Sequence, residues 1–217
     1  FLRDRPREDT RREKLDLRGT YAALAASCRH ANRTFWLVSI SYFLGFTAIF
    51  ALLFHQVAYL QELGLSARTA AVAAGLVGLV GLPGRLLFPM LGDRLRPSFI
   101  IAGIFLGTGL SAAVLPGSVE RLWLYLYVGL FGISFGAVLP MRALIMSHHF
   151  GGPLYGRLMG LQFTLLALAT AGGPLAAGVL RDALESYALL PPAAITLLLL
   201  AIPTILATER GRRPEAT

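Results

Sequence analysis

Long stretches without charge constrain this chain more than any other feature of its sequence. Between consecutive Asp, Glu, Lys and Arg residues it has uncharged runs of 28, 23, 20, 23 and 23 residues, at 34–61, 97–119, 122–141, 158–180 and 186–208. An α-helix rises about 1.5 Å per residue, so about 20 apolar residues cross the roughly 30 Å hydrocarbon core of a bilayer. The pattern predicts five transmembrane helices. Only 15% of the residues are charged and mean hydropathy is +0.63, which excludes an ordinary soluble domain.

A sixth span is interrupted by one charge. The uncharged run 69–84 has only 16 residues, but reading through Arg85 to Gly92 gives a 24-residue segment. We therefore predict an all-α membrane protein with six transmembrane helices, which form one bundle over 34–208. The expected spans are about 34–61, 69–92, 98–117, 122–141, 158–180 and 187–207.

Positive charge gathers at alternate ends of these spans. The stretches 1–33, 93–97, 143–157 and 209–217 hold 15 Lys and Arg residues, whereas the other connections hold three, Arg68, Arg121 and Arg181. Basic flanks stay in the cytoplasm. The bias predicts an integral protein of the plasma (inner) membrane with both termini cytoplasmic. It also explains most of the net charge of +8 without a nucleic-acid partner.

The segment before the first span has its own pattern. Acidic residues interleave with its arginines, and Leu17, Tyr21, Leu24 and Cys28 recur at helical spacing. This spacing favours an amphipathic helix along the inner membrane surface over a solvated linker. Because the chain starts at Phe1 without a signal-peptide core, we expect it to be a fragment of a longer protein. Arginine makes up 19 of its 20 basic residues, which suggests a bacterial source.

Glycines recur at helical spacing in four of the predicted spans. The second span carries Gly75, Gly78, Gly81 and Gly84, and pairs four residues apart occur at 103/107, 132/136 and 156/160. Helices in lipid associate through close packing of small residues rather than through a hydrophobic drive. These positions predict tightly packed helix pairs.

Two arginines are candidates for function within or beside the spans. A charge inside the bilayer is costly, so it is a functional hypothesis by default. Arg85 lies about 11 Å from the loop at Asp93, counted by helical rise, and either binds substrate or snorkels to the interface. Arg142 ends the fourth span after Pro140 and is a candidate for snorkelling or for an inner-gate ion pair.

Uncharged polar residues give further candidates. His55, with Gln56 and Tyr59, lies toward the outer end of the first span and either carries a coupling proton or hydrogen-bonds at the interface. Gln162 in the fifth span can hydrogen-bond a substrate or a neighbouring helix. The chain has no hydrolase, zinc-protease or nucleotide-binding motif, which argues against an enzyme, a metal site and any cofactor.

The chain resembles the carboxyl-terminal half of a major facilitator superfamily transporter over essentially its whole length. The run Gly84–Arg96 is similar to the end of helix eight and the following cytoplasmic loop, and Phe35-Trp36-Leu37 opening a long span is similar to helix seven. Residues 1–33 then resemble the central cytoplasmic loop, and 209–217 would be a cytoplasmic tail. The resemblance implies one half of a twelve-helix alternating-access transporter whose amino-terminal half is missing.

Within this superfamily the chain looks most like the monocarboxylate porter and oxalate/formate antiporter group. In that group an arginine on helix eight contacts the substrate carboxylate, and Arg85 falls at that position. The resemblance also implies a gate at Asp93 and Arg94, and transport of a small organic anion by proton symport or antiport. Drug or sugar/metabolite efflux, and a six-helix oligomeric scaffold without transport, are the alternatives.

Overall fold

The structure is a computed structural model that describes residues 31–92 and 94–209, and every regular element in these residues is a helix. The α-helices are α2 (Arg33–Glu62), α3 (Ala67–Leu91), α4 (Pro97–Val114), α5 (Arg121–His149), α6 (Pro153–Leu184) and α7 (Leu190–Leu206), with a 3-10 turn η1 (Leu115–Gly117) after α4. Five of them are long and apolar enough to cross a membrane, and the apolar α7 is shorter, at 17 residues. The prediction of an all-α membrane fold is confirmed.

Each predicted span corresponds to one helix. α6 extends beyond its expected span of 158–180 at both ends, and α5 extends beyond its expected span of 122–141. It continues to His149, so the connection to α6 is only Phe150–Gly152. Met141, Ile145 and Met146 are fully buried, and their packing holds the last turns of α5 in helical form beyond the apolar run.

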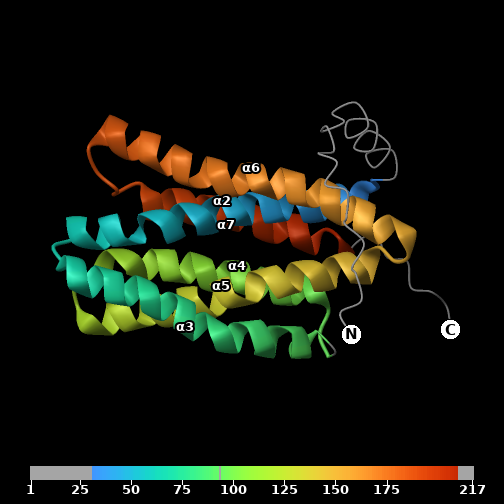
Figure 1. Cartoon of the computed structure of the whole chain (residues 1–217), viewed down its shortest axis with the longest axis horizontal. Helices are drawn as coiled ribbons and strands as arrows, with labels where there is room; N and C mark the ends of the chain where they lie inside the picture. Colours follow the sequence, from blue (N-terminus) through green and yellow to red (C-terminus); the bar gives the residue numbers. More distant parts are fainter. Residues whose placement is uncertain (1–30, 93, 210–217) are drawn as a thin grey trace, which may run out of the picture.

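The helices run roughly side by side along the long axis of the molecule (Figure 1). α2 packs against α6 and α7, α4 packs between α5 and α7, and α3 packs chiefly on α5. The start of α2 and the end of α7 lie at the same end of the bundle, here called the near end. The connections after α2, α4 and α6 lie at the opposite end, here called the far end.

Local sequence signals set the helix ends. Asn32 Oδ1 accepts a hydrogen bond from the backbone N–H of Phe35 at 2.9 Å, and Ser66 Oγ accepts one from that of Thr69 at 3.2 Å. Such side chains satisfy amide groups that have no partner within the helix. Gly64, with φ of +97°, turns the chain between α2 and α3 in a conformation that other residues rarely adopt.

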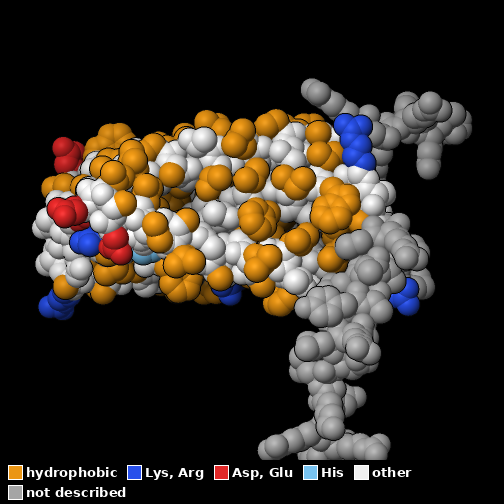
Figure 2. Space-filling model, turned by 90° about the horizontal axis from the view of Figure 1, so that it is seen from above, with side chains coloured by type: hydrophobic (Ala, Val, Ile, Leu, Met, Phe, Trp, Pro, Cys, Tyr) orange, Lys and Arg blue, Asp and Glu red, His pale blue; other side chains and the backbone are white. Residues whose placement is uncertain are grey.

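The surface of the bundle is apolar along most of its length. Figure 2 shows one face with hydrophobic side chains over its middle and most charged side chains at its two ends. This distribution matches a protein whose middle contacts lipid and whose ends contact water.

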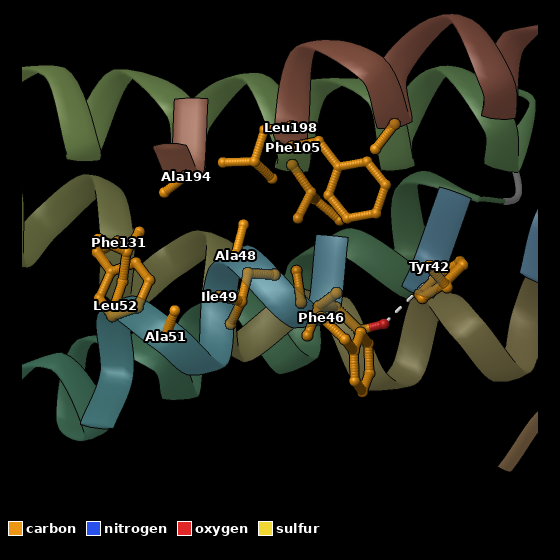
Figure 3. Close-up of a cluster of buried hydrophobic side chains, with 14 of the residues drawn as sticks. Tyr42, Phe46, Ala48, Ile49, Ala51, Leu52, Phe105, Phe131, Ala194 and Leu198 are labelled. Carbon is orange, nitrogen blue, oxygen red and sulfur yellow. Dashed lines mark hydrogen bonds between the residues drawn. The ribbon is translucent and has the colours of Figure 1, made fainter. Parts of the chain in front are cut away.

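The core is centred on α2. Tyr42, Ile49 and Leu52 are fully buried on it, and Phe105 of α4 and Phe131 of α5 are fully buried around it. In Figure 3, Phe105 and Leu198 point toward α2 from the neighbouring helices. This packing fixes the rotation of α2, and with it the direction in which the remaining α2 side chains point.

Glycines bring α3 and α5 into close contact. A Cβ atom on Gly132 would lie 2.8 Å from the carbonyl oxygen of Val77, and one on Gly136 would lie 2.6 Å from the carbonyl carbon of Gly81. The glycine pattern predicted close packing, but it did not say which helices would pair. Other glycines of the same pattern have nothing within 4 Å of an added Cβ, among them Gly75, Gly78, Gly156 and Gly160.

Polar groups connect the helices at other points. Ser41 Oγ donates to the carbonyl oxygen of Ala201 on α7 at 2.7 Å, and the Tyr127 hydroxyl donates to Gln56 Oε1 at 2.9 Å. At the near end, Arg96 pairs with Glu209 at 3.2 Å. The predicted amphipathic helix within 17–28, the tail from 210 and Asp93 lie outside the described residues.

Candidate functional site

A cavity of about 490 Å³ lies among α2, α5 and α6. One wall is a row of phenyl rings on α2, because Phe46, Phe50 and Phe54 are four residues apart and fall on one helix face. Their ring centroids are 5.5 Å apart for the first pair and 6.3 Å for the second. Phe163 of α6 and Leu139 of α5 also line the cavity. The result is a largely apolar wall with aromatic character.

Arg142 is the only charged residue among the described residues that line this cavity. Its side chain comes from α5 and is held by α6: Nε donates to Gln162 Oε1 at 2.8 Å, and Nη2 donates to the carbonyl oxygen of Met159 at 3.3 Å. Its guanidinium carbon lies 5.8 Å from the centroid of the Phe163 ring, within range of a cation–π interaction. Arg142 thus makes a polar bridge between α5 and α6.

The positive charge of Arg142 is buried without a carboxylate partner. The residue is 8% exposed, and none of the ion pairs found over residues 31–92 and 94–209 includes it. A buried charge is costly unless an opposite charge or enough hydrogen bonds compensate it. The cavity therefore presents a cation that an anion would stabilise.

Gln162 adds a second donor beside this guanidinium. Its Oε1 must face Arg142 because the guanidinium can only donate, which fixes the orientation of the amide. Its Nε2 is then buried and has no hydrogen-bond partner among the described residues. Gln162 is fully buried and is not among the residues that line the cavity, so Arg142 supplies the donors there, and a guanidinium suits a carboxylate, sulfonate or similar group.

A second polar cluster joins α2 to α6 and the following loop at the far end. His55 Nε2 lies 3.0 Å from the carbonyl oxygen of Pro174, and His55 Nδ1 lies 3.0 Å from the Tyr187 hydroxyl. Since a carbonyl only accepts, Nε2 carries a proton, and Nδ1 accepts from Tyr187 when the ring is neutral. Glu62 Oε1 accepts from Ser186 Oγ at 2.6 Å and from the backbone N–H of Tyr187 at 2.9 Å.

The structure distributes the residues proposed for substrate binding among several places. Gln162 lies beside Arg142, whereas His55 and the buried Tyr59 lie near Tyr187 at the far end. Arg85 is exposed on α3 and is not among the residues lining the cavity.

The residues proposed for gating are also separated. Arg94 is exposed in the turn between α3 and α4, and its proposed partner Asp93 is outside the described residues. Arg142 was expected to end the fourth span, but α5 continues seven residues beyond it to His149, and its side chain lines the cavity.

Sequence reasoning missed the aromatic wall. The signal was the spacing of Phe46, Phe50 and Phe54, which places three rings on one helix face. It was missed because phenylalanine is also common on faces that contact lipid or a helix core. The Glu62–Ser186 contact joins residues 124 positions apart and had no local signal.

In the described part of the chain, a bundle of apolar helices, five of them long enough to cross a bilayer, defines an integral membrane protein. A family model of the Major Facilitator Superfamily matches residues 1–174. The chain therefore belongs to the Major Facilitator Superfamily, and it is a membrane transporter of that superfamily. No curated protein matches it.

Proposed function

We propose that this protein is a secondary active transporter of a small organic anion, such as a monocarboxylate, which binds in the cavity at Arg142. The observation that carries the proposal is the buried guanidinium of Arg142, which lines the cavity and has no carboxylate partner among the described residues. A guanidinium binds a carboxylate through two parallel hydrogen bonds, so it supplies direction as well as charge.

The chain would be the carboxyl-terminal half of a twelve-helix transporter. Its resemblance to helices seven to twelve supports this assignment. So does the exposure of α3 and α6, which are less buried than the other long helices. A second six-helix half would cover these faces and close the cavity, and rocking of the two halves would expose the substrate to each side in turn.

Arg85 is a second candidate for substrate contact. It shares the exposed side of α3 with Gly75 and Gly78, whose positions have nothing within 4 Å of an added Cβ. In the proposed twelve-helix protein this face would meet the other half or the central pathway. Arg85 would then contact the anion in a different conformation from the one in which Arg142 holds it. A proton gradient, used in symport or antiport, is the proposed driving force, and Asp93 and Arg94 remain the proposed gate.

Uptake into proteoliposomes tests the role of Arg142. Radiolabelled monocarboxylates and dicarboxylates would be offered to wild type, Arg142→Lys, Arg142→Gln and Arg85→Lys. Arg121→Gln is the matched control, because Arg121 is exposed at the start of the same helix. Each variant is first checked for a single monodisperse species in detergent.

We expect uptake to fall about 10- to 100-fold in both Arg142 variants, the range for loss of hydrogen bonds to a charged group. Lysine keeps the charge but loses the planar fork, so it should not restore uptake. Wild-type uptake rates in Arg142→Gln would overturn the assignment of Arg142. A loss confined to Arg85→Lys would move the anion site to α3.

A further inference from the structure

We infer that the anion bound at Arg142 carries a single negative charge and an aromatic body. This inference rests on the proposed function, and it names the substrate class of the same cavity. It follows from three properties of the site: the chemistry of its walls, the number of its cations and its size.

The walls favour a flat apolar group. Phe46, Phe50 and Phe54 present three rings in a row from α2, and Phe163 faces the cavity from α6. Aromatic rings associate with one another at centroid distances of about 4.5–7 Å, in offset or edge-to-face arrangements. A ring inserted between the α2 row and Phe163 would add such contacts, whereas a short hydrophilic anion would leave the exposed rings of Phe54 and Phe163 uncovered.

The polar groups favour one charge. Among the described residues that line the cavity, Arg142 is the single cation. Its Nε and one N–H of its Nη2 already donate hydrogen bonds to α6. Thr170 also lines the cavity, but its hydroxyl donates to the carbonyl oxygen of Leu166 in its own helix at 2.8 Å. A second carboxylate on the substrate would therefore be buried against apolar side chains without a partner.

The positions of these groups also match such a substrate. Arg142 and Phe163 are adjacent, with the guanidinium 5.8 Å from the ring centroid. A carboxylate bound to Arg142 thus places the attached body beside the Phe163 ring. The cavity of about 490 Å³ lies within the roughly 300–1,000 Å³ typical of small-molecule sites and is far larger than formate or oxalate needs.

The inference is tested by measuring, with calorimetry, the binding of four probes to the purified full-length protein in detergent. Phenylacetate carries one charge and a ring, and acetate carries the charge alone. Phenylacetamide carries the ring without the charge, and phenylmalonate carries the ring with two charges. Binding in detergent avoids the passive diffusion of protonated aromatic acids through vesicle membranes.

The variants replace aromatic rings with smaller aliphatic side chains, so the sites stay apolar. Phe54→Leu and Phe163→Leu change cavity-lining residues that are 66% and 65% exposed, so neither substitution disturbs the buried core. Phe43→Leu is the matched control, since Phe43 is exposed on α2 but does not line the cavity. Arg142→Gln is included to report on the anion site itself.

We expect wild type to bind phenylacetate at least about tenfold more tightly than acetate, phenylacetamide or phenylmalonate. Phe54→Leu and Phe163→Leu should each reduce the preference over acetate by about tenfold, which corresponds to about 1.4 kcal/mol, and Phe43→Leu should keep it. Binding of acetate or phenylmalonate equal to that of phenylacetate, with loss in Arg142→Gln, would overturn the aromatic monoanion but leave the anion transporter intact. Binding of phenylacetamide equal to that of phenylacetate would overturn the proposed anion site itself.

Discussion

Substitution of Gly136 by alanine tests the close approach of α3 and α5, on which the position of Arg142 depends. Gly136 lies six residues before Arg142 in α5. A Cβ atom at Gly136 would lie 2.6 Å from the carbonyl carbon and 2.8 Å from the Cα of Gly81. Both are backbone atoms that cannot rotate away, so the two helices must separate to reach ordinary contact distances.

The same helix supplies a control that removes the effect of helix propensity. An added Cβ at Gly129 meets nothing within 4 Å, and both substitutions gain the same propensity of about 0.8–1 kcal/mol. The difference between the variants therefore isolates the steric cost. Overpacking of a close-packed interior costs about 1–3 kcal/mol. At about 2–4 °C per kcal/mol for a chain of this size, Gly136→Ala should melt about 2–12 °C below Gly129→Ala.

Thermal unfolding in detergent, followed by tryptophan fluorescence or by loss of monodisperse protein, measures this difference. Gly129→Ala should match or exceed wild type. Equal melting temperatures for the two alanine variants would refute the reasoning, because they would show that α3 and α5 are separated enough to admit a methyl group at the crossing.

Two further contacts give predictions at other points of the bundle. Glu62→Ala removes the acceptor for Ser186 Oγ and for the Tyr187 backbone N–H. Amide hydrogen exchange at residues 185–189 should therefore rise. Unchanged exchange would show that Glu62 does not order this loop. Tyr127→Phe removes the hydroxyl that donates to Gln56 Oε1 and leaves that buried acceptor unpaired, which costs about 1–3 kcal/mol. Its melting temperature should fall, and a Tyr127→Phe/Gln56→Leu double variant should recover part of the loss.

The spans and their alternation could be predicted from the sequence with little error. Transfer of a side chain into the bilayer is a local property, so uncharged runs locate the helices without knowledge of their neighbours. The boundaries that differ most are the end of α5 and both ends of α6. At the end of α5, the burial of Met146 against other helices extends the helix beyond the apolar run.

The site was predictable only in part. The sequence singled out Arg85 and Arg142 as the costly charges, and Gln162 as the polar residue of the fifth span. It assigned substrate contact to Arg85 and the gate to Arg142, because the sequence gives depth along a helix but not the direction in which a side chain points. Arg142 faces the cavity because α5 is rotated by its contact with α3 and because Gln162 and Met159 of α6 hold the guanidinium.

By itself, then, the sequence determined the class of fold and the approximate positions of its apolar helices, since each depends on the free energy of single residues in water or lipid. The tertiary structure alone decided that the phenyl row on α2 and Arg142 of α5 share one cavity. That juxtaposition depends on the rotation of two helices whose residues are about 90 positions apart, and it is fixed by packing, which no local pattern encodes.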